Sequence, residues 1–90
     1  MKSTHTEEYQ QALAALISAR KERQILQTDL AQRLGKPQSF VSKFECRERR
    51  LDIVEFIEVC RAMGANPVTV LRDAGLITED DIQSGSPPRF

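Results

Sequence analysis

The chain has 90 residues, 40% of them hydrophobic, and its formal net charge at pH 7 is zero. A chain of this length forms one small domain with a single core, too small to also enclose a roomy active site. It contains no run of eighteen apolar residues, and its polar N-terminus is unlike a signal peptide, so we expect a soluble cytoplasmic protein with no membrane partner.

Hydrophobic periodicity predicts the first three helices. Residues 6–23 carry apolar side chains at spacings of three and four, with strong helix formers between them. Residues 27–34 predict a second helix of barely two turns that Gly35 closes. Pro37 suits the first turn of a third helix that runs to residue 45 or 46. Helices this short are marginal in water, so both must dock an apolar face on the rest of the fold.

Two further helices follow. Asp52 and Glu55 predict a capping box for a fourth helix through Met63, and its wide apolar stripe predicts heavy burial. Asn66 and Pro67 predict a fifth helix to about residue 74. We expect one all-α, five-helix domain over residues 8–77, with a flexible leader at 1–7. Residues 78–90 are expected to be a partly disordered tail, in which residues 78–81 could start one more turn.

Side chains suited to catalysis or metal binding are scarce. Cys46 and Cys60 lie fourteen positions apart with no second pair, which matches neither a zinc site nor a disulfide framework. His5 is the only histidine. We therefore expect reduced thiols, no cofactor, no metal and no enzymatic activity. Basic residues lie next to Cys46 in sequence, and a redox switch at its thiol is a hypothesis.

The charge is unevenly distributed. Residues 20–50 carry nine basic and four acidic residues, a local charge of +5, whereas the rest of the chain carries −5. A nucleic acid responds to the face that it meets, within a Debye length of ~8 Å at physiological salt, and not to the total charge. An ordinary solvated surface also explains such charge, so the asymmetry alone does not decide between the two.

The predicted third helix directs polar side chains outward. They are amides, hydroxyls and an amine, contributed by Gln38, Ser39, Ser42 and Lys43. Such groups can read base edges in the major groove, where glutamine bonds adenine and lysine reaches guanine acceptors. A glutamine at a helix start is more often merely solvated, so the pattern needs further support.

The stretch "LQTDLAQRLGKPQSFVSKFECRERRLDIVEF" resembles the helix-turn-helix of the Cro/repressor type, also called the xenobiotic-response-element type. This family includes phage repressors and many bacterial regulators. The matching positions are Gln27, Leu30-Ala31, Leu34-Gly35, Gln38-Ser39, Val41-Ser42-Lys43, Phe44 and Glu45, and the resemblance extends from about residue 13 to 71. It implies a five-helix, lambda-repressor-like DNA-binding domain.

The resemblance also implies roles for single residues. Gln38, Ser39 and Lys43 correspond to base-contacting positions, and Gln27 to a glutamine that bonds a phosphate and braces Gln38. The remaining phosphate-binding candidates are Arg47, Arg49 and Arg50 in the loop after the third helix, and the outward hydroxyl of Ser42. Arg20 and Glu45 correspond to a structural ion pair between the first and third helices.

Phe40 falls where this family varies. Its ring could touch a thymine methyl as a further base contact. It could instead pack against a second copy of the chain or fill a groove in the fold. The sequence leaves these alternatives open.

Three departures from the family pattern affect the loops. The family usually has glycine where Gln24 and Arg47 stand, at positions that tend to need a positive φ. It usually has threonine or serine as N-cap where Leu26 stands. Each departure is expected to cost on the order of 1 kcal/mol.

The resulting hypothesis is a sequence-specific transcriptional regulator, with a repressor favoured, whose third helix enters the major groove of double-stranded DNA. A homodimer is expected because one module covers a half-site, with apolar residues of 68–77 as the chosen surface. No small-molecule effector is expected. The alternatives are an antitoxin or restriction–modification controller of the same fold, and a helical protein-interaction module that does not bind DNA.

Overall fold

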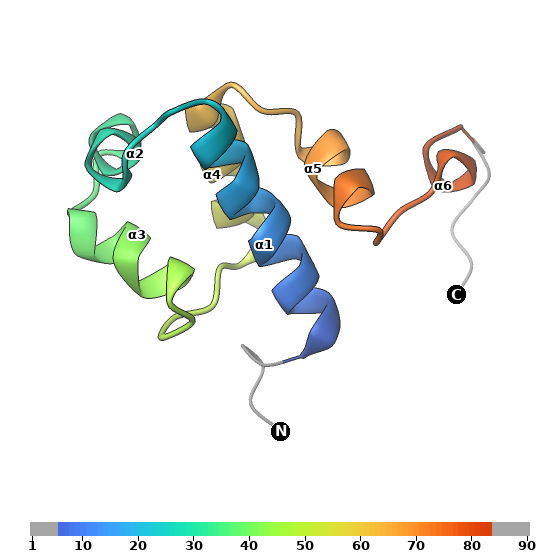
Figure 1. Cartoon of the computed structure of the whole chain (residues 1–90), viewed down its shortest axis with the longest axis horizontal. Helices are drawn as coiled ribbons and strands as arrows, with labels where there is room; N and C mark the ends of the chain where they lie inside the picture. The colour runs from blue at the N-terminus through green and yellow to red at the C-terminus, as the bar shows by residue number, and fades with distance from the viewer. Residues whose placement is uncertain (1–5, 84–90) are drawn as a thin grey trace.

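The structure, a computed structural model, describes residues 6–83, and all its regular elements in that range are helices. The predicted leader and tail fall largely on residues 1–5 and 84–90, which lie outside the described residues. The elements are α1 (Glu7–Glu22), α2 (Gln27–Leu34), α3 (Gln38–Glu45), α4 (Ile53–Met63), α5 (Pro67–Asp73) and α6 (Glu79–Gln83). The predicted all-α class is confirmed. In Figure 1, α2 and α3 lie on one side of α1 and α4, and α5 and α6 lie on the other.

The helix ends follow from local sequence chemistry. Gly35 closes α2 in the left-handed conformation, with φ of 68°. The Asp52 carboxylate accepts a 2.7 Å hydrogen bond from the Glu55 amide, and the Glu55 carboxylate accepts one of 3.0 Å from the Asp52 amide, so the predicted capping box is formed. Pro37 differs from the expectation. Its ψ of 153° is extended, so it precedes α3, and Gln38 is the first helical residue.

A single core holds the bent α2–α3 pair on the rest of the fold. Leu30 of α2 and Val41 and Phe44 of α3 are each at most 1% exposed. They belong to one cluster with Leu16 of α1 and Val59 of α4. Complete burial of such side chains contributes roughly 1.5–3 kcal/mol each. This packing supplies the stability that two-turn helices lack by themselves.

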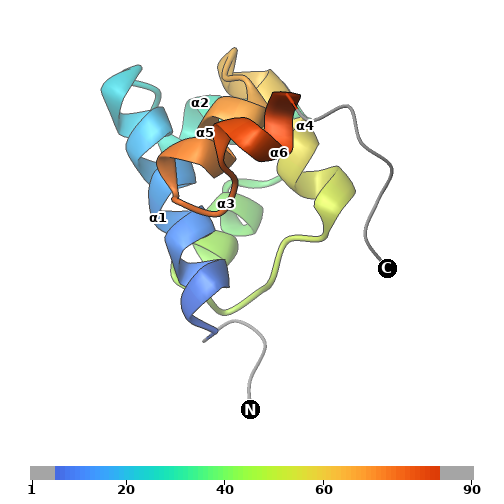
Figure 2. The ribbon, with the colours of Figure 1, turned by 90° about the vertical axis from the view of Figure 1, so that its right-hand side faces the viewer.

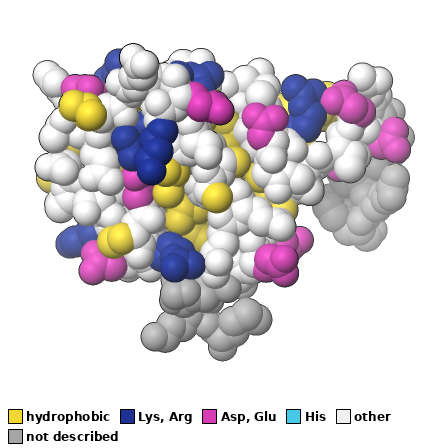
Figure 3. Space-filling view, in the orientation of Figure 1, with side chains coloured by type: hydrophobic (Ala, Val, Ile, Leu, Met, Phe, Trp, Pro, Cys, Tyr) yellow, Lys and Arg dark blue, Asp and Glu magenta, His cyan; other side chains and the backbone are white. Residues whose placement is uncertain are grey.

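The prediction that α4 is heavily buried is wrong for its first turn. Ile53 is 75% exposed and Val54 is 60% exposed, whereas Val59, Cys60 and Met63 further along are in the core. The apolar stripe of α4 is therefore only partly used by the fold. Figure 3 views the molecule from the side of α1, with α4 behind it, and shows a different group of hydrophobic side chains near the middle of that face.

One short helix follows the five that were predicted. The Thr78 hydroxyl accepts a hydrogen bond from the Asp81 amide, and the Asp81 carboxylate accepts one from the Thr78 amide, which starts α6. Figure 2 shows α5 and α6 on the side of the molecule away from α3. Between residues 6 and 83, no helix has the length and apolarity needed to cross a bilayer.

Candidate nucleic-acid interface

The outward side of α3 is polar and accessible. Gln38, Ser39 and Lys43 are exposed, and Ser42 is partly buried. Ser39 and Lys43 are four residues apart, as are Gln38 and Ser42, so each pair lies along one line of the helix surface. Val41 and Phe44 point into the core and fix the rotation of α3 about its axis.

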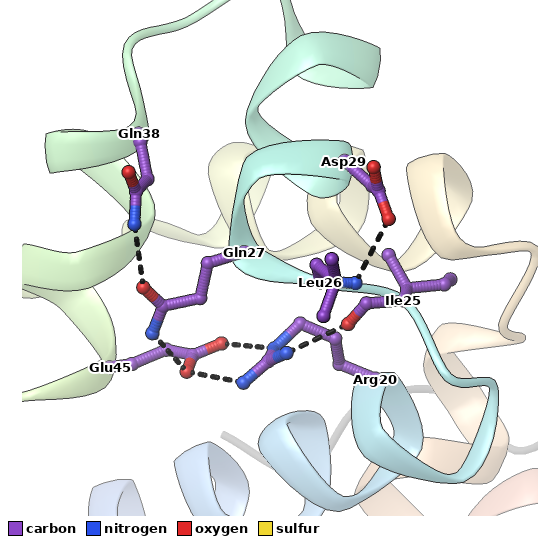
Figure 4. Close-up of polar contacts among 7 residues, drawn as sticks. All are labelled: Arg20, Ile25, Leu26, Gln27, Asp29, Gln38 and Glu45. Carbon is purple, nitrogen blue, oxygen red and sulfur yellow. Dashed lines mark hydrogen bonds and ion pairs between the residues drawn. The ribbon is translucent and has the colours of Figure 1, made fainter.

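A chain of side-chain hydrogen bonds ties this face to the fold, as Figure 4 shows. Gln38 Nε2 donates to Gln27 Oε1 over 3.4 Å, and Gln27 Nε2 donates to Glu45 Oε1 over 2.9 Å. Arg20 donates to both Glu45 carboxylate oxygens over 2.7 and 2.9 Å. It also donates to the carbonyl of Ile25 over 2.7 Å. The first residue of α3 is thereby linked through α2 to α1.

The inner end of this chain is a buried ion pair. The Arg20 and Glu45 side chains are 10% and 9% exposed. The cost of removing these charges from water is offset only where their hydrogen bonds are satisfied, and here the contact is bidentate. Arg20 and Glu45 therefore act in the fold, and their contribution to the interface is to orient Gln27.

Five basic side chains lie on α3 or in the segments next to it. Lys36 belongs to the turn before it, Lys43 is on it, and Arg47, Arg49 and Arg50 follow it. The Arg50 guanidinium lies 4.8 Å from the centroid of the Tyr9 ring. The predicted phosphate-binding residues Arg47, Arg49 and Arg50 thus share the loop between α3 and α4, which we call the basic loop.

Arg49 is held by α4. Its Nη1 and Nη2 donate to the two carboxylate oxygens of Glu55 over 2.9 and 2.6 Å, and Nη1 also donates to the Arg50 carbonyl. The hydrogen bonding with the Glu55 carboxylate raises the pKa of Arg49. The same hydrogen bond with Arg49, followed by the bond from the Asp52 amide, lowers the pKa of Glu55 below its ordinary value. Glu55 thus caps α4 and fixes the basic loop.

Phe40 is partly buried and has three neighbours that were not predicted as a group. Its ring lies edge-on to Phe44, with centroids 5.6 Å apart. The Lys36 ammonium lies over the Phe40 ring at 5.1 Å and the Arg49 guanidinium at 4.8 Å. Contact with a thymine methyl stays a prediction.

The two cysteines occupy different surroundings. Cys60 is fully buried, and this burial raises the pKa of its thiol to about 11. Cys46 is exposed, and its Sγ donates to Glu48 Oε2 over 3.3 Å. The proposed redox role of Cys46 stays a hypothesis. Among residues 6–83, no three His, Cys, Asp or Glu side chains are grouped to hold a metal ion.

Known proteins resemble both the sequence and this geometry. A helix-turn-helix family model matches residues 16–70, more than half of the chain. The chain belongs to the Cro/repressor-type, or XRE, helix-turn-helix family. A solved XRE-family like protein from Pseudomonas syringae pv. tomato str. DC3000 is 47% identical, with a TM-score of 0.75. The match covers 82% of this chain and 90% of that one. No curated protein matches the chain. Membership makes this chain a DNA-binding helix-turn-helix regulator.

The structure accounts for the departures from the XRE pattern. Gln24 and Arg47 adopt φ of 57° and 68°, so both stand where a glycine would be unstrained. Leu26 precedes α2 and has no side-chain acceptor to cap it. Asp29 supplies half of a capping box instead, because its carboxylate accepts a 3.2 Å hydrogen bond from the Leu26 amide.

Two residues that contact this candidate interface were not assigned to it from the sequence. Glu55 was expected only as a helix cap, and Lys36 only as part of a basic segment. Glu55 meets Arg49 across the loop between α3 and α4, where no helical spacing rule applies. Lys36 is four positions from Phe40, but it lies before the start of α3, so the helical i,i+4 rule does not predict their contact. The signal in the sequence was limited to an acidic residue that closely follows three arginines.

Proposed function

We propose that this XRE-family chain is a sequence-specific transcriptional regulator, acting as a repressor, whose α3 enters the major groove of double-stranded DNA. The braced position of Gln38 carries the proposal. Its amide is exposed on α3 and is held by Gln27, so it is oriented before a base pair arrives. A glutamine fixed in this way can form the bidentate bond that distinguishes adenine.

In this proposal the protein contacts fall into two classes. Gln38, Ser39 and Lys43 contact base edges, while the basic loop and Gln27 contact phosphates. Phosphate contacts set affinity and the register on the duplex, and base contacts set the preferred sequence. No catalytic step is part of this function.

A dimer would double the length of DNA that is read. Of the residues expected at the dimer surface, Val70 is only 4% exposed and belongs to the core, whereas Val68 is 42% exposed. We place the interface at the start of α4 instead. There Ile53 and Val54 are exposed beside an apolar groove of about 250 Å³, formed with α1 and α5. In sequence, this surface directly follows the basic loop after α3. A dimer formed there would place its two α3 helices in successive major grooves.

The proposal is tested by binding to random duplex DNA across a salt series. Affinity should fall steeply with salt, because each neutralised phosphate contributes about −0.9 to the slope of log K against log salt. Arg47→Ala should weaken binding to all sequences about equally and reduce that slope by about one.

The matched control is Arg72→Ala, which removes an exposed arginine of α5 on the other side of the molecule. It should leave both affinity and slope unchanged. Salt-independent binding, or no binding, would instead favour a protein-interaction module.

A further inference from the structure

Phe40 lies at the rim of the α3 face that the proposed function assigns to DNA. With about 100° of rotation per residue, Phe40 falls between the outward Lys43 and the buried Phe44. Its ring contacts the core through Phe44, and cations from the segments before and after α3 lie over it. This position places Phe40 beside the base-reading side chains.

Two cations from different segments meet on this ring. Lys36 comes from the turn before α3, and Arg49 comes from the loop after it. Both lie within the ~6 Å at which an aromatic face attracts a cation. Phe40, Lys36 and Arg49 thus form a small cluster that connects the segment before α3 with the loop after it.

Arg49 is restrained on a second side by Glu55. The guanidinium uses three of its five N–H donors on the Glu55 carboxylate and the Arg50 carbonyl. Two donors are left for a phosphate oxygen. Because the side chain is already stacked and paired, little rotamer freedom remains to be lost when it meets DNA.

We propose that Phe40 is a positioning residue for DNA binding, whose ring holds Arg49 and Lys36 in place for phosphate contacts. This inference rests on the proposed function. A ring that two cations cover has less surface to offer a thymine methyl. Phe40 therefore governs affinity for all sequences and not the choice of base.

The first test is Phe40→Leu, which keeps most of the apolar volume and removes the aromatic face. The affinity of this variant for a DNA site selected by the wild type and its affinity for random duplex DNA should fall by the same factor, about two- to fivefold. The preferred sequence should stay unchanged. Phe40→Tyr, which keeps the face, should bind as the wild type does. Thermal unfolding is measured for each variant so that DNA binding is compared between folded chains.

A double-mutant cycle asks whether Phe40 acts through the cations. In a chain that carries Lys36→Ala and Arg49→Ala, Phe40→Leu should have almost no further effect on DNA affinity. An effect of undiminished size would show that Phe40 only supports the core, and would overturn the proposal.

Arg49→Lys provides a second variant that leaves the core intact. The lysine keeps the charge but cannot form the pair of hydrogen bonds to Glu55. Affinity for DNA should therefore fall about two- to fivefold, while the slope of log K against log salt stays unchanged. If Arg49→Lys binds DNA with wild-type affinity, the proposal is overturned. It is also overturned if Phe40→Leu changes the preferred DNA sequence at one base pair. If the wild type binds DNA and Phe40→Leu binds equally well, only this inference fails. If the wild type binds no duplex, the proposed function fails with it.

Discussion

Gln24 and Arg47 hold left-handed backbone conformations, with φ of 57° and 68°. An L-residue other than glycine pays roughly 1 kcal/mol there, because its Cβ crowds the neighbouring carbonyl oxygen. The resemblance predicted this strain from the positions alone. The chain accepts it at the two loops that connect α1 to α2 and α3 to α4.

Gln24→Gly should therefore raise the free energy of unfolding by up to about 1 kcal/mol. Denaturant unfolding followed by circular dichroism measures the change. Gln32→Gly, at an exposed position inside α2, is the matched control and should lower stability by about the same amount. A loss of stability in Gln24→Gly would contradict the assigned strain.

Single-residue roles differ in how far the sequence predicts them. The pairing of Gln27 with Gln38 was predicted only because the family provides it, since the two residues are eleven positions apart. The contacts of Phe40 had no such guide. They depend on the path of two loops, because Arg49 contacts both the ring of Phe40 and the carboxylate of Glu55 on α4.

At the scale of elements, α3 is anchored in two ways. Apolar packing fixes its rotation, and the Arg20–Glu45 ion pair ties its end to α1. Helix limits were predictable because they follow from local residues such as Gly35, Asp52 and Asn66. Burial was less predictable. Periodicity identifies an apolar face, but whether a neighbour covers all of it depends on the packing of distant segments, and this is why Ile53 was misjudged.

Breaking the ion pair should destabilise the fold strongly. Glu45→Ala leaves the buried Arg20 charge unpaired, so the free energy of unfolding should fall by about 3 kcal/mol or more. Chemical denaturation measures this loss. The double variant Arg20→Met, Glu45→Leu removes both charges and should recover most of it. If the double variant is as unstable as Glu45→Ala, the cause is lost packing and not an unpaired charge.

At the scale of the whole molecule, exposed apolar side chains lie on two different helices, α4 and α5. One group lies at the start of α4, where Ile53 is 75% exposed, and the other lies on α5, where Val68 is 42% exposed. Our proposal assigns self-association to the first, because it adjoins the basic loop that follows α3. Half-sites on one face of DNA require the two α3 helices to lie one turn apart, ~34 Å.

Ile53→Glu should therefore weaken dimerisation by more than about tenfold, because a carboxylate would be buried without a partner. Sedimentation equilibrium measures the dissociation constant. Val68→Glu, with the same change on α5, is the control and should dimerise normally. The reverse result would place the interface on α5.

The central claim is that Gln38, braced by Gln27, reads a base pair from α3. Selection of bound sites from random DNA tests it most directly, with wild type and Gln38→Ala compared in parallel. The wild type should select a palindrome, and Gln38→Ala should lose about 1–3 kcal/mol of discrimination at one base pair of each half-site. Gln11→Ala, which removes an exposed glutamine of α1, should select the wild-type sequence. An identical preferred sequence from wild type and Gln38→Ala would contradict the account.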